Sequence, residues 1–450
     1  MESVLKEIHV TNFKSLKDVK VVFNNFNVIV GRNGSGKTNF IELFKFLKNV
    51  LVEEKRPYMP YADWWSYDNI VWKRKAELPI KVGLRMKVHG HSFFYEFVFG
   101  TIGGTSRIIE EKLTIDEIVS IKREGSSLRV EHDKKFLEKY AKKIEHLLQK
   151  KKEKIKVEYL LEHITNLPPD FSNLLHLFRH GHSFSAELKY GLCLTVLEPI
   201  YTEGNRLVFV FPVKKNVRAT IKNEEIRKSI EIGFPFAFIL FEEFGTAIEH
   251  FTILRHPNIK EIKSPTMPRK EEVLSEDSSN LHNVLYYWFL EKNGKLPERI
   301  EKALSTLFPH IQVRPSLTSE GKVFLQMFEA GVELAPPCMP DGLYKLLAIL
   351  SAIELKPALL AIDEIENSLH AELLEYILDE LRNSGVTVIV TTHSPLVVDM
   401  VKLEELLVSE MTADGTVLRR VKDPKEVREK LRKLKITQSE SWIYGALPVD

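Results

Sequence analysis

The sequence predicts an α/β fold that combines a parallel sheet with an antiparallel β subdomain and a large, mostly helical insertion. Three observations support this prediction. An apolar strand, a glycine-rich loop and an apolar helix follow one another at residues 26–44. Two further apolar strands, at 358–362 and 386–390, flank a helix and both end in polar residues. Alternating apolar residues at 81–99 indicate an antiparallel hairpin in the chain between these two parts.

Length, composition and charge limit the kind of protein. With 450 residues the chain exceeds one ordinary core, so we expect more than one lobe. The formal net charge is only +2, so any nucleic-acid-binding surface would have to be local. The two cysteines, Cys193 and Cys338, are too few for a disulfide scaffold and too far apart for a metal-ligand pattern. Without an apolar run of 18 residues or a signal peptide, we expect a cytoplasmic protein and no membrane partner.

The glycine-rich loop matches the Walker A pattern G-x-x-x-x-G-K-T from Gly31 to Thr38. Glycines let successive backbone N–H groups point at phosphate oxygens, and the following helix N-terminus adds the positive end of its dipole. We expect Lys37 to reach the β- and γ-phosphates of ATP and Thr38 to bind Mg²⁺. The residues expected to line the nucleotide here are Arg32, Asn33, Gly34, Ser35, Gly36, Lys37, Thr38 and Asn39. A chance glycine-rich turn is the alternative, and the flanking strand and helix oppose it.

Polar side chains with catalytic chemistry follow both C-terminal strands. Asp363 and Glu364 end the first strand in a Walker B pattern, and His393 follows the second. Asp363 is expected to hold the Mg²⁺ water shell, and Glu364 to polarise the water that attacks the γ-phosphate. Each alone has a plainer interpretation, as a solvated strand end or a hydrogen-bonded loop histidine. Because parallel strands present their carboxyl ends at one edge, we predict one catalytic site containing Glu364, His393 and Lys37.

These motifs resemble the ABC-type ATPase heads of the SMC, RecF and OLD-like group, and above all its smaller stand-alone members. The resemblance covers both ends of the chain, about 1–50 and 270–450, and implies a P-loop NTPase head of the ABC type. It includes the segment Ile8–Leu16 before the P-loop, which implies Lys14 and Ser15 as further nucleotide contacts. In this group the histidine of the second strand is the switch residue of the ATP site.

The resemblance also implies a signature helix that completes the ATP site of a partner subunit. Its best match is Met339–Lys345, with Asp341 and Gly342 facing the nucleotide across a dimer interface. Pro340 departs from the group's pattern, because a serine hydroxyl commonly stands there and proline supplies neither that hydroxyl nor an N–H. A helix start with an aspartate cap is the alternative interpretation of this segment.

We expect three units along the chain: an N-terminal ATPase lobe at 1–130, a helical insertion at 131–270 and a C-terminal ATPase lobe at 271–450. Two lysine-rich segments, Lys150–Lys156 and Lys425–Lys435, are candidate basic patches for DNA. A solvated helix face is the commoner explanation of such segments.

The leading functional hypothesis is a nucleotide-dependent switch that binds and hydrolyses ATP and forms a homodimer when ATP is bound. By resemblance its output would be DNA repair, maintenance or defence against foreign DNA, with DNA and a separate nuclease as partners. The alternative is a non-catalytic, ATP-gated scaffold or effector-binding module. Pro340 and the lack of an assignable Q-loop glutamine favour that alternative, whereas Glu364 and His393 oppose it. A transporter ATPase is disfavoured by the large insertion and the same missing glutamine.

Overall fold

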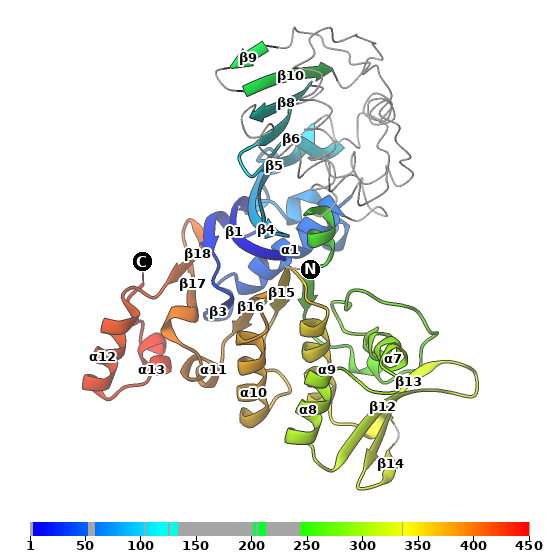
Figure 1. The fold of residues 1–450 in the computed structure, drawn as a ribbon. Helices are drawn as coiled ribbons and strands as arrows, with labels where there is room; N and C mark the ends of the chain where they lie inside the picture. Colours follow the sequence, from blue (N-terminus) through cyan, green and yellow to red (C-terminus); the bar gives the residue numbers. More distant parts are fainter. Residues whose placement is uncertain are drawn as a thin grey trace.

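The computed structural model describes residues 3–52, 59–102, 105–124, 127–133, 201–203, 206–212, 244–334 and 336–449. In these residues a mixed, largely parallel sheet lies in the middle of the molecule, between a large antiparallel sheet and a group of helices (Figure 1). The fold is therefore mixed α/β with parallel and antiparallel sheets, as the sequence predicts.

The central sheet has six strands, and the P-loop strand lies inside it. In spatial order they are β11 (Thr252–Leu254), β15 (Leu359–Ile362), β16 (Thr387–Thr392), β3 (Phe26–Val30), β17 (Leu406–Thr412) and β18 (Gly415–Arg420). The first five strands are parallel to one another, and β18 is antiparallel to β17. Every residue of β3, β15 and β16 is buried, which is the pattern of strands covered on both faces.

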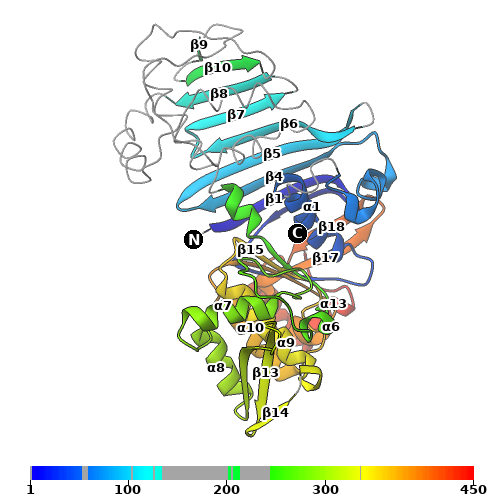
Figure 2. The ribbon, with the colours of Figure 1, turned by 90° about the vertical axis from the view of Figure 1, so that its right-hand side faces the viewer.

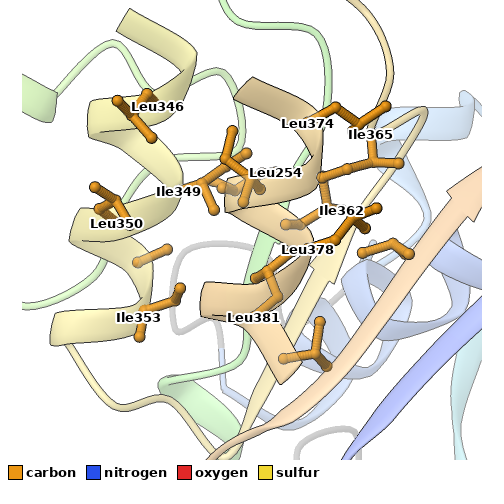
Figure 3. Packing of buried hydrophobic residues seen from close by; sticks show 14 of the residues in the cluster. Leu254, Leu346, Ile349, Leu350, Ile353, Ile362, Ile365, Leu374, Leu378 and Leu381 are labelled. Atoms are coloured by element: carbon orange, nitrogen blue, oxygen red, sulfur yellow. The ribbon is translucent and has the colours of Figure 1, made fainter. Parts of the chain in front are cut away.

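Helices and the second sheet cover the two faces of the central sheet. On one side, α1 (Lys37–Leu51) shares a hydrophobic core with the antiparallel sheet. On the other side, α9 (Asp341–Glu354) and α10 (Ala371–Arg382) belong to a second core. Figure 3 shows how this second core interdigitates between the two helices and the strand ends. The labelled side chains are Leu346, Ile349, Leu350 and Ile353 of α9, Leu374, Leu378 and Leu381 of α10, and Leu254, Ile362 and Ile365.

The antiparallel sheet has nine described strands and extends away from the central sheet (Figure 2). In spatial order they are β2 (Leu16–Val22), β1 (Ser3–Phe13), β4 (Ile80–Val88), β5 (His91–Ile102), β6 (Thr105–Ile115), β7 (Val119–Glu124), β8 (Ser127–Asp133), β10 (Arg206–Pro212) and β9 (Tyr201–Glu203). The predicted hairpin at 81–99 is present as β4 and β5, whose apolar alternation buries Val82, Leu84 and Met86 against Phe93, Tyr95 and Phe97.

Where it is described, the expected helical insertion at 131–270 contains both strands and helices. Residues 201–203 and 206–212 form strands that extend the antiparallel sheet, and β11 joins the central sheet, so these residues are not helical. Residues 244–249 are helical, and Phe244, Ile248 and Phe251 are buried. The lysine-rich segment Lys150–Lys156 and Cys193 lie outside the described residues.

The C-terminal half adds a small three-stranded sheet and short helices. The strands β12 (Ile311–Leu317) and β13 (Val323–Glu329) form a hairpin around Gly321, which β14 (Val332–Leu334) extends. The remaining helices are α6 (Ile259–Ile262), α7 (Leu281–Glu291), α8 (Glu298–Leu307), α11 (Pro395–Met400), α12 (Pro424–Leu434) and α13 (Gln438–Ile443). Short 3₁₀ turns lie at Ala62–Trp64, Tyr67–Asn69, Trp72–Arg74, Pro336–Cys338 and Leu403–Glu405. Among the described helices, none has both the length and the apolar character needed to cross a bilayer.

Candidate nucleotide site

The carboxyl ends of three neighbouring strands form the floor of the candidate site. In the parallel register, Ile362 of β15 pairs with Val390 of β16, and Thr392 of β16 pairs with Val30 of β3. The residues that follow these strands therefore emerge at one edge of the sheet. They are Asp363 and Glu364 after β15, His393 after β16, and Gly31 at the start of the glycine-rich loop. The structure brings the two distant Walker motifs together.

The glycine-rich loop has the backbone conformation that a phosphate cradle needs. Gly34 and Gly36 both have positive φ, 79° and 98°, and Gly36 is the N-cap of α1. The loop is supported from behind by β17 and β18, because Ser409 Oγ and Thr416 Oγ1 donate to the carbonyl oxygen of Ser35 at 3.0 and 3.1 Å. A Cβ on Gly36 would lie 1.9 Å from Thr416 Oγ1, so only glycine fits there.

The Walker A lysine is buried within this loop. Lys37 Nζ donates to the carbonyl oxygens of Gly31 (2.7 Å) and Arg32 (3.1 Å). Burial lowers the pKa of Lys37, and the negative charges of nearby Asp363 and Glu364 partly oppose that effect. The ammonium group therefore lies within electrostatic reach of the Walker B carboxylates, although the two motifs are more than 300 residues apart in sequence.

Thr391 couples the Walker B strand to the histidine strand. Its hydroxyl donates to Asp363 Oδ1 at 2.5 Å and accepts from the backbone N–H of Glu364 at 2.9 Å. Asp363 is 4% exposed, and its own N–H donates to the carbonyl oxygen of Leu254 at the end of β11. Hydrogen bonds therefore tie Asp363 to both neighbouring strands, through its carboxylate to β16 and through its backbone N–H to β11.

A buried lysine of the signature helix supports the turn that carries Glu364. Glu364 has a left-handed backbone (φ 51°), which is costly for a residue with a Cβ. Lys345 Nζ donates to the carbonyl oxygens of Glu364 (3.1 Å) and Asn367 (2.8 Å), while Asn367 Nδ2 donates to Glu364 Oε2 (2.7 Å). Burial lowers the pKa of Lys345 to about 8, partly offset by the charges of Glu366 and Glu364. No role for Lys345 is evident from the sequence.

Lys14 and Ser15, the two nucleotide contacts expected before the P-loop, differ from each other in their surroundings. Ser15 lies beside the P-loop, because its hydroxyl accepts from Asn39 Nδ2 at 2.7 Å and from Thr416 Oγ1 at 2.8 Å. Lys14 Nζ instead pairs with Glu42 of α1 and lies 5.3 Å from the centroid of the Trp64 ring. Arg32, Asn33 and Gly34 are exposed at the loop tip, and Thr38 is half-buried. The nucleotide-lining role of all these residues remains a prediction.

The signature segment forms the predicted helix, and the start of this helix contacts other segments of the same chain. The helix α9 begins at Asp341 with Pro340 as its N-cap, and the cap makes no side-chain hydrogen bond. Asp341 pairs with Lys263 at 3.1 Å rather than capping the helix. A Cβ on Gly342 would lie 2.9 Å from the carbonyl oxygen of Ser368 in the loop after β15. The helix start is therefore fixed against that loop.

Arg255 is a site residue that was not identified from the sequence. It follows β11 directly, and its Nε is buried 3.7 Å from Asp363 Oδ2. Its Nη1 lies 3.3 Å from Glu42 Oε1 and 3.4 Å from Glu276 Oε1. The only sequence signal is a charged residue after a short apolar run.

The site fits a magnesium-bound nucleoside triphosphate. Its glycine loop, helix N-terminus and buried lysine suit phosphate groups, and the hydroxyl and carboxylate of Thr38 and Asp363 are hard oxygen donors of the kind Mg²⁺ prefers. The fold and the site define a P-loop ATPase of the ABC type, which confirms the predicted fold class.

The chain belongs to the family described as "AAA domain, putative AbiEii toxin, Type IV TA system", whose model matches residues 26–156 and 198–399. The match includes both Walker motifs and the histidine strand. Among curated proteins, no match to the chain is found.

Solved structures with a similar fold include SMC head domains. The SMC head bound to the C-winged helix domain of ScpA is 13% identical, with 94% of this chain and 99% of that chain covered and a TM-score of 0.46. The SMC head domain from Thermotoga maritima is 14% identical, with coverage of 93% and 99% and a TM-score of 0.41. The Smc head from Pyrococcus furiosus, bound to the C-terminal domain of ScpA, is 11% identical, with coverage of 96% and 100% and a TM-score of 0.42.

Proposed function

We propose that this protein binds and hydrolyses ATP and that ATP drives two copies to associate. The observation that supports the proposal is the meeting of the strand ends, which sets Lys37 within electrostatic reach of Asp363 and Glu364. Each group then has one task. Lys37 neutralises the β- and γ-phosphates, and Thr38 and Asp363 hold Mg²⁺, which supplies further positive charge against the phosphate oxygens.

Glu364 is the residue that activates the attacking water in this proposal. Its carboxylate accepts a hydrogen bond from Asn367, and its backbone is fixed by Lys345 and Thr391. A carboxylate held in this way can accept a hydrogen bond from water and orient it toward the γ-phosphorus. His393 lies on the neighbouring strand end, and its side chain is 45% exposed, so it can approach the γ-phosphate from the open side.

Association of two copies would use the N-terminus of α9, where Asp341 and Gly342 lie, against the nucleotide of the partner. Bound ATP would then add contacts that exist only in the dimer, and association would depend on nucleotide concentration. DNA repair, maintenance or defence against foreign DNA is the setting we propose for this switch. A role in a Type IV TA system, which the family description names, is another such setting.

Turnover of the wild type and of Glu364→Gln tests the proposal. We expect phosphate release by the wild type, loss of at least 100-fold in the variant, and ATP-dependent dimerisation of both by light scattering. A scaffold that only senses ATP would show dimerisation without turnover in either protein, and this result would refute hydrolysis. Pro340 at the N-cap of α9 is the feature that favours the scaffold.

DNA binding has its own test. The exposed lysines and arginines of α12 and its C-cap lie next to acidic side chains, including Glu426 and Glu429, and Arg428 pairs with Glu404 at 3.0 Å. ATPase rates measured with and without double-stranded and single-stranded DNA over a salt series test whether DNA is a partner. A stimulation that fades with salt supports DNA as partner, whereas rates independent of DNA refute it.

A further inference from the structure

A second carboxylate near Walker B holds the histidine of the site. Glu366 Oε1 accepts a hydrogen bond from the backbone N–H of His393 at 2.9 Å, and His393 Nδ1 lies 3.0 Å from the same oxygen. One carboxylate oxygen therefore faces two nitrogens of a single residue. It fixes both the backbone at the end of β16 and the rotation of the imidazole ring.

The two side chains of this pair differ in their exposure to solvent. The Glu366 side chain is 13% exposed and that of His393 is 45% exposed, so the carboxylate lies behind the ring. Glu366 Oε2 is buried and has no hydrogen-bond partner within the described residues. Leaving such an oxygen without a donor costs stability. The charge of Glu366 acts to raise the pKa of Lys37 and of Lys345, but neither lysine donates a hydrogen bond to this oxygen. A purely structural carboxylate would be expected to have both oxygens satisfied.

We propose that Glu366 is a positioning residue for His393 in ATP hydrolysis, an inference that rests on the proposed function. With Nδ1–H donated to Glu366, the ring presents Nε2 to the open side of the site. In this orientation Nε2 is the ring nitrogen that faces the γ-phosphate. A carboxylate that orients an imidazole through Nδ1 is a recurrent catalytic arrangement, and small misplacements of such a group lower rates by up to about 100-fold.

The arrangement differs from the role of Glu364. The Glu364 side chain is held by Asn367 and its main chain by Thr391, whereas the Glu366 side chain makes no hydrogen bond with either residue within the described chain. The motif Asp363-Glu364-Ile365-Glu366 therefore supplies three acids with three tasks. The intervening Ile365 is fully buried, which keeps Glu364 and Glu366 on the polar side of the turn.

Steady-state kinetics of Glu366→Ala and Glu366→Gln test the inference. We expect Glu366→Ala to lower kcat at least tenfold with KM changed less than twofold, because ATP is still bound by the P-loop. Glutamine keeps an oxygen that can accept both N–H groups, so Glu366→Gln should stay within about threefold of the wild type. Glu372→Ala, at an exposed acid in the first turn of α10, is the matched control and should leave kcat unchanged.

A double-mutant cycle with His393→Ala shows whether Glu366 acts through the histidine. In that background, Glu366→Ala should lower kcat by less than twofold further. Equal losses in both backgrounds, a glutamine variant as slow as the alanine variant, or an unchanged kcat in Glu366→Ala would each overturn the inference. If the wild type itself shows no turnover, the proposed function fails as well, whereas a normal wild type with any of these three results refutes only the positioning role.

Discussion

Replacement of Lys345 by methionine should change how stability depends on pH. Lys345 is 4% exposed, and burial lowers its pKa from 10.5 to about 8 in the folded protein. Its folded pKa is depressed, so between these values the unfolded chain binds more protons than the folded chain. The free energy of unfolding therefore rises with pH across this window in the wild type. Methionine has a similar length and no titrating group, so the variant lacks this contribution.

The expected size follows from the two pKa values. Integrated from pH 7.5 to pH 9.5, this single group adds about 2 kcal/mol to the free energy of unfolding of the wild type relative to Lys345→Met. Urea unfolding of both proteins at the two pH values measures this difference, because other titrating groups cancel between them. Lys302→Met, at an exposed lysine of α8, is the control and should match the wild type at both pH values.

Equal pH slopes in the wild type and Lys345→Met would refute the account of Lys345 as a buried, partly neutralised lysine. The same variant also removes the donor to the Glu364 and Asn367 carbonyl oxygens. Its ATPase rate should therefore fall even where its stability equals that of the wild type. A normal rate would mean that the turn keeps its conformation without the lysine.

Two more predictions concern the P-loop and the metal site. Gly36→Ala should weaken ATP binding and lower the melting temperature more than Gly34→Ala, because both have positive φ but only Gly36 faces an atom, Thr416 Oγ1, within 4 Å. Nucleotide titration and thermal unfolding check this, and equal effects would contradict it. Arg255→Met should lower the Mg²⁺ concentration for half-maximal turnover about fivefold, since a positive charge beside Asp363 opposes the cation. A Mg²⁺ titration measures this value, and a higher requirement would indicate that Arg255 helps to hold the nucleotide.

The strand ends of the site could be predicted from sequence because each motif is local. The apolar run before Gly31 and the one before Asp363 are unbroken, and parallel pairing puts their ends together. Arg255 could not be found in this way. Its strand β11 has three residues, and it is defined by pairing with β15, more than 100 positions later.

Lys345 escaped prediction for a different reason. A lysine in a helix ordinarily faces water, whereas Lys345 is buried and its ammonium group is covered by the turn after β15. Glu366 also could not be predicted. Its spacing from Asp363 is visible in the sequence, but its contact with His393 forms only when β15 and β16 pair. Tertiary packing, and not local propensity, creates these three roles.

The antiparallel sheet begins at the nucleotide site and ends far from it. Its first hairpin carries Ser15, which touches Asn39 of the P-loop helix, and eight inter-strand spacings separate β2 from β9. At about 4.8 Å per spacing the sheet reaches roughly 38 Å. If the hairpin tilted by about 10°, the outer strand would move through roughly 7 Å, by the same spacing.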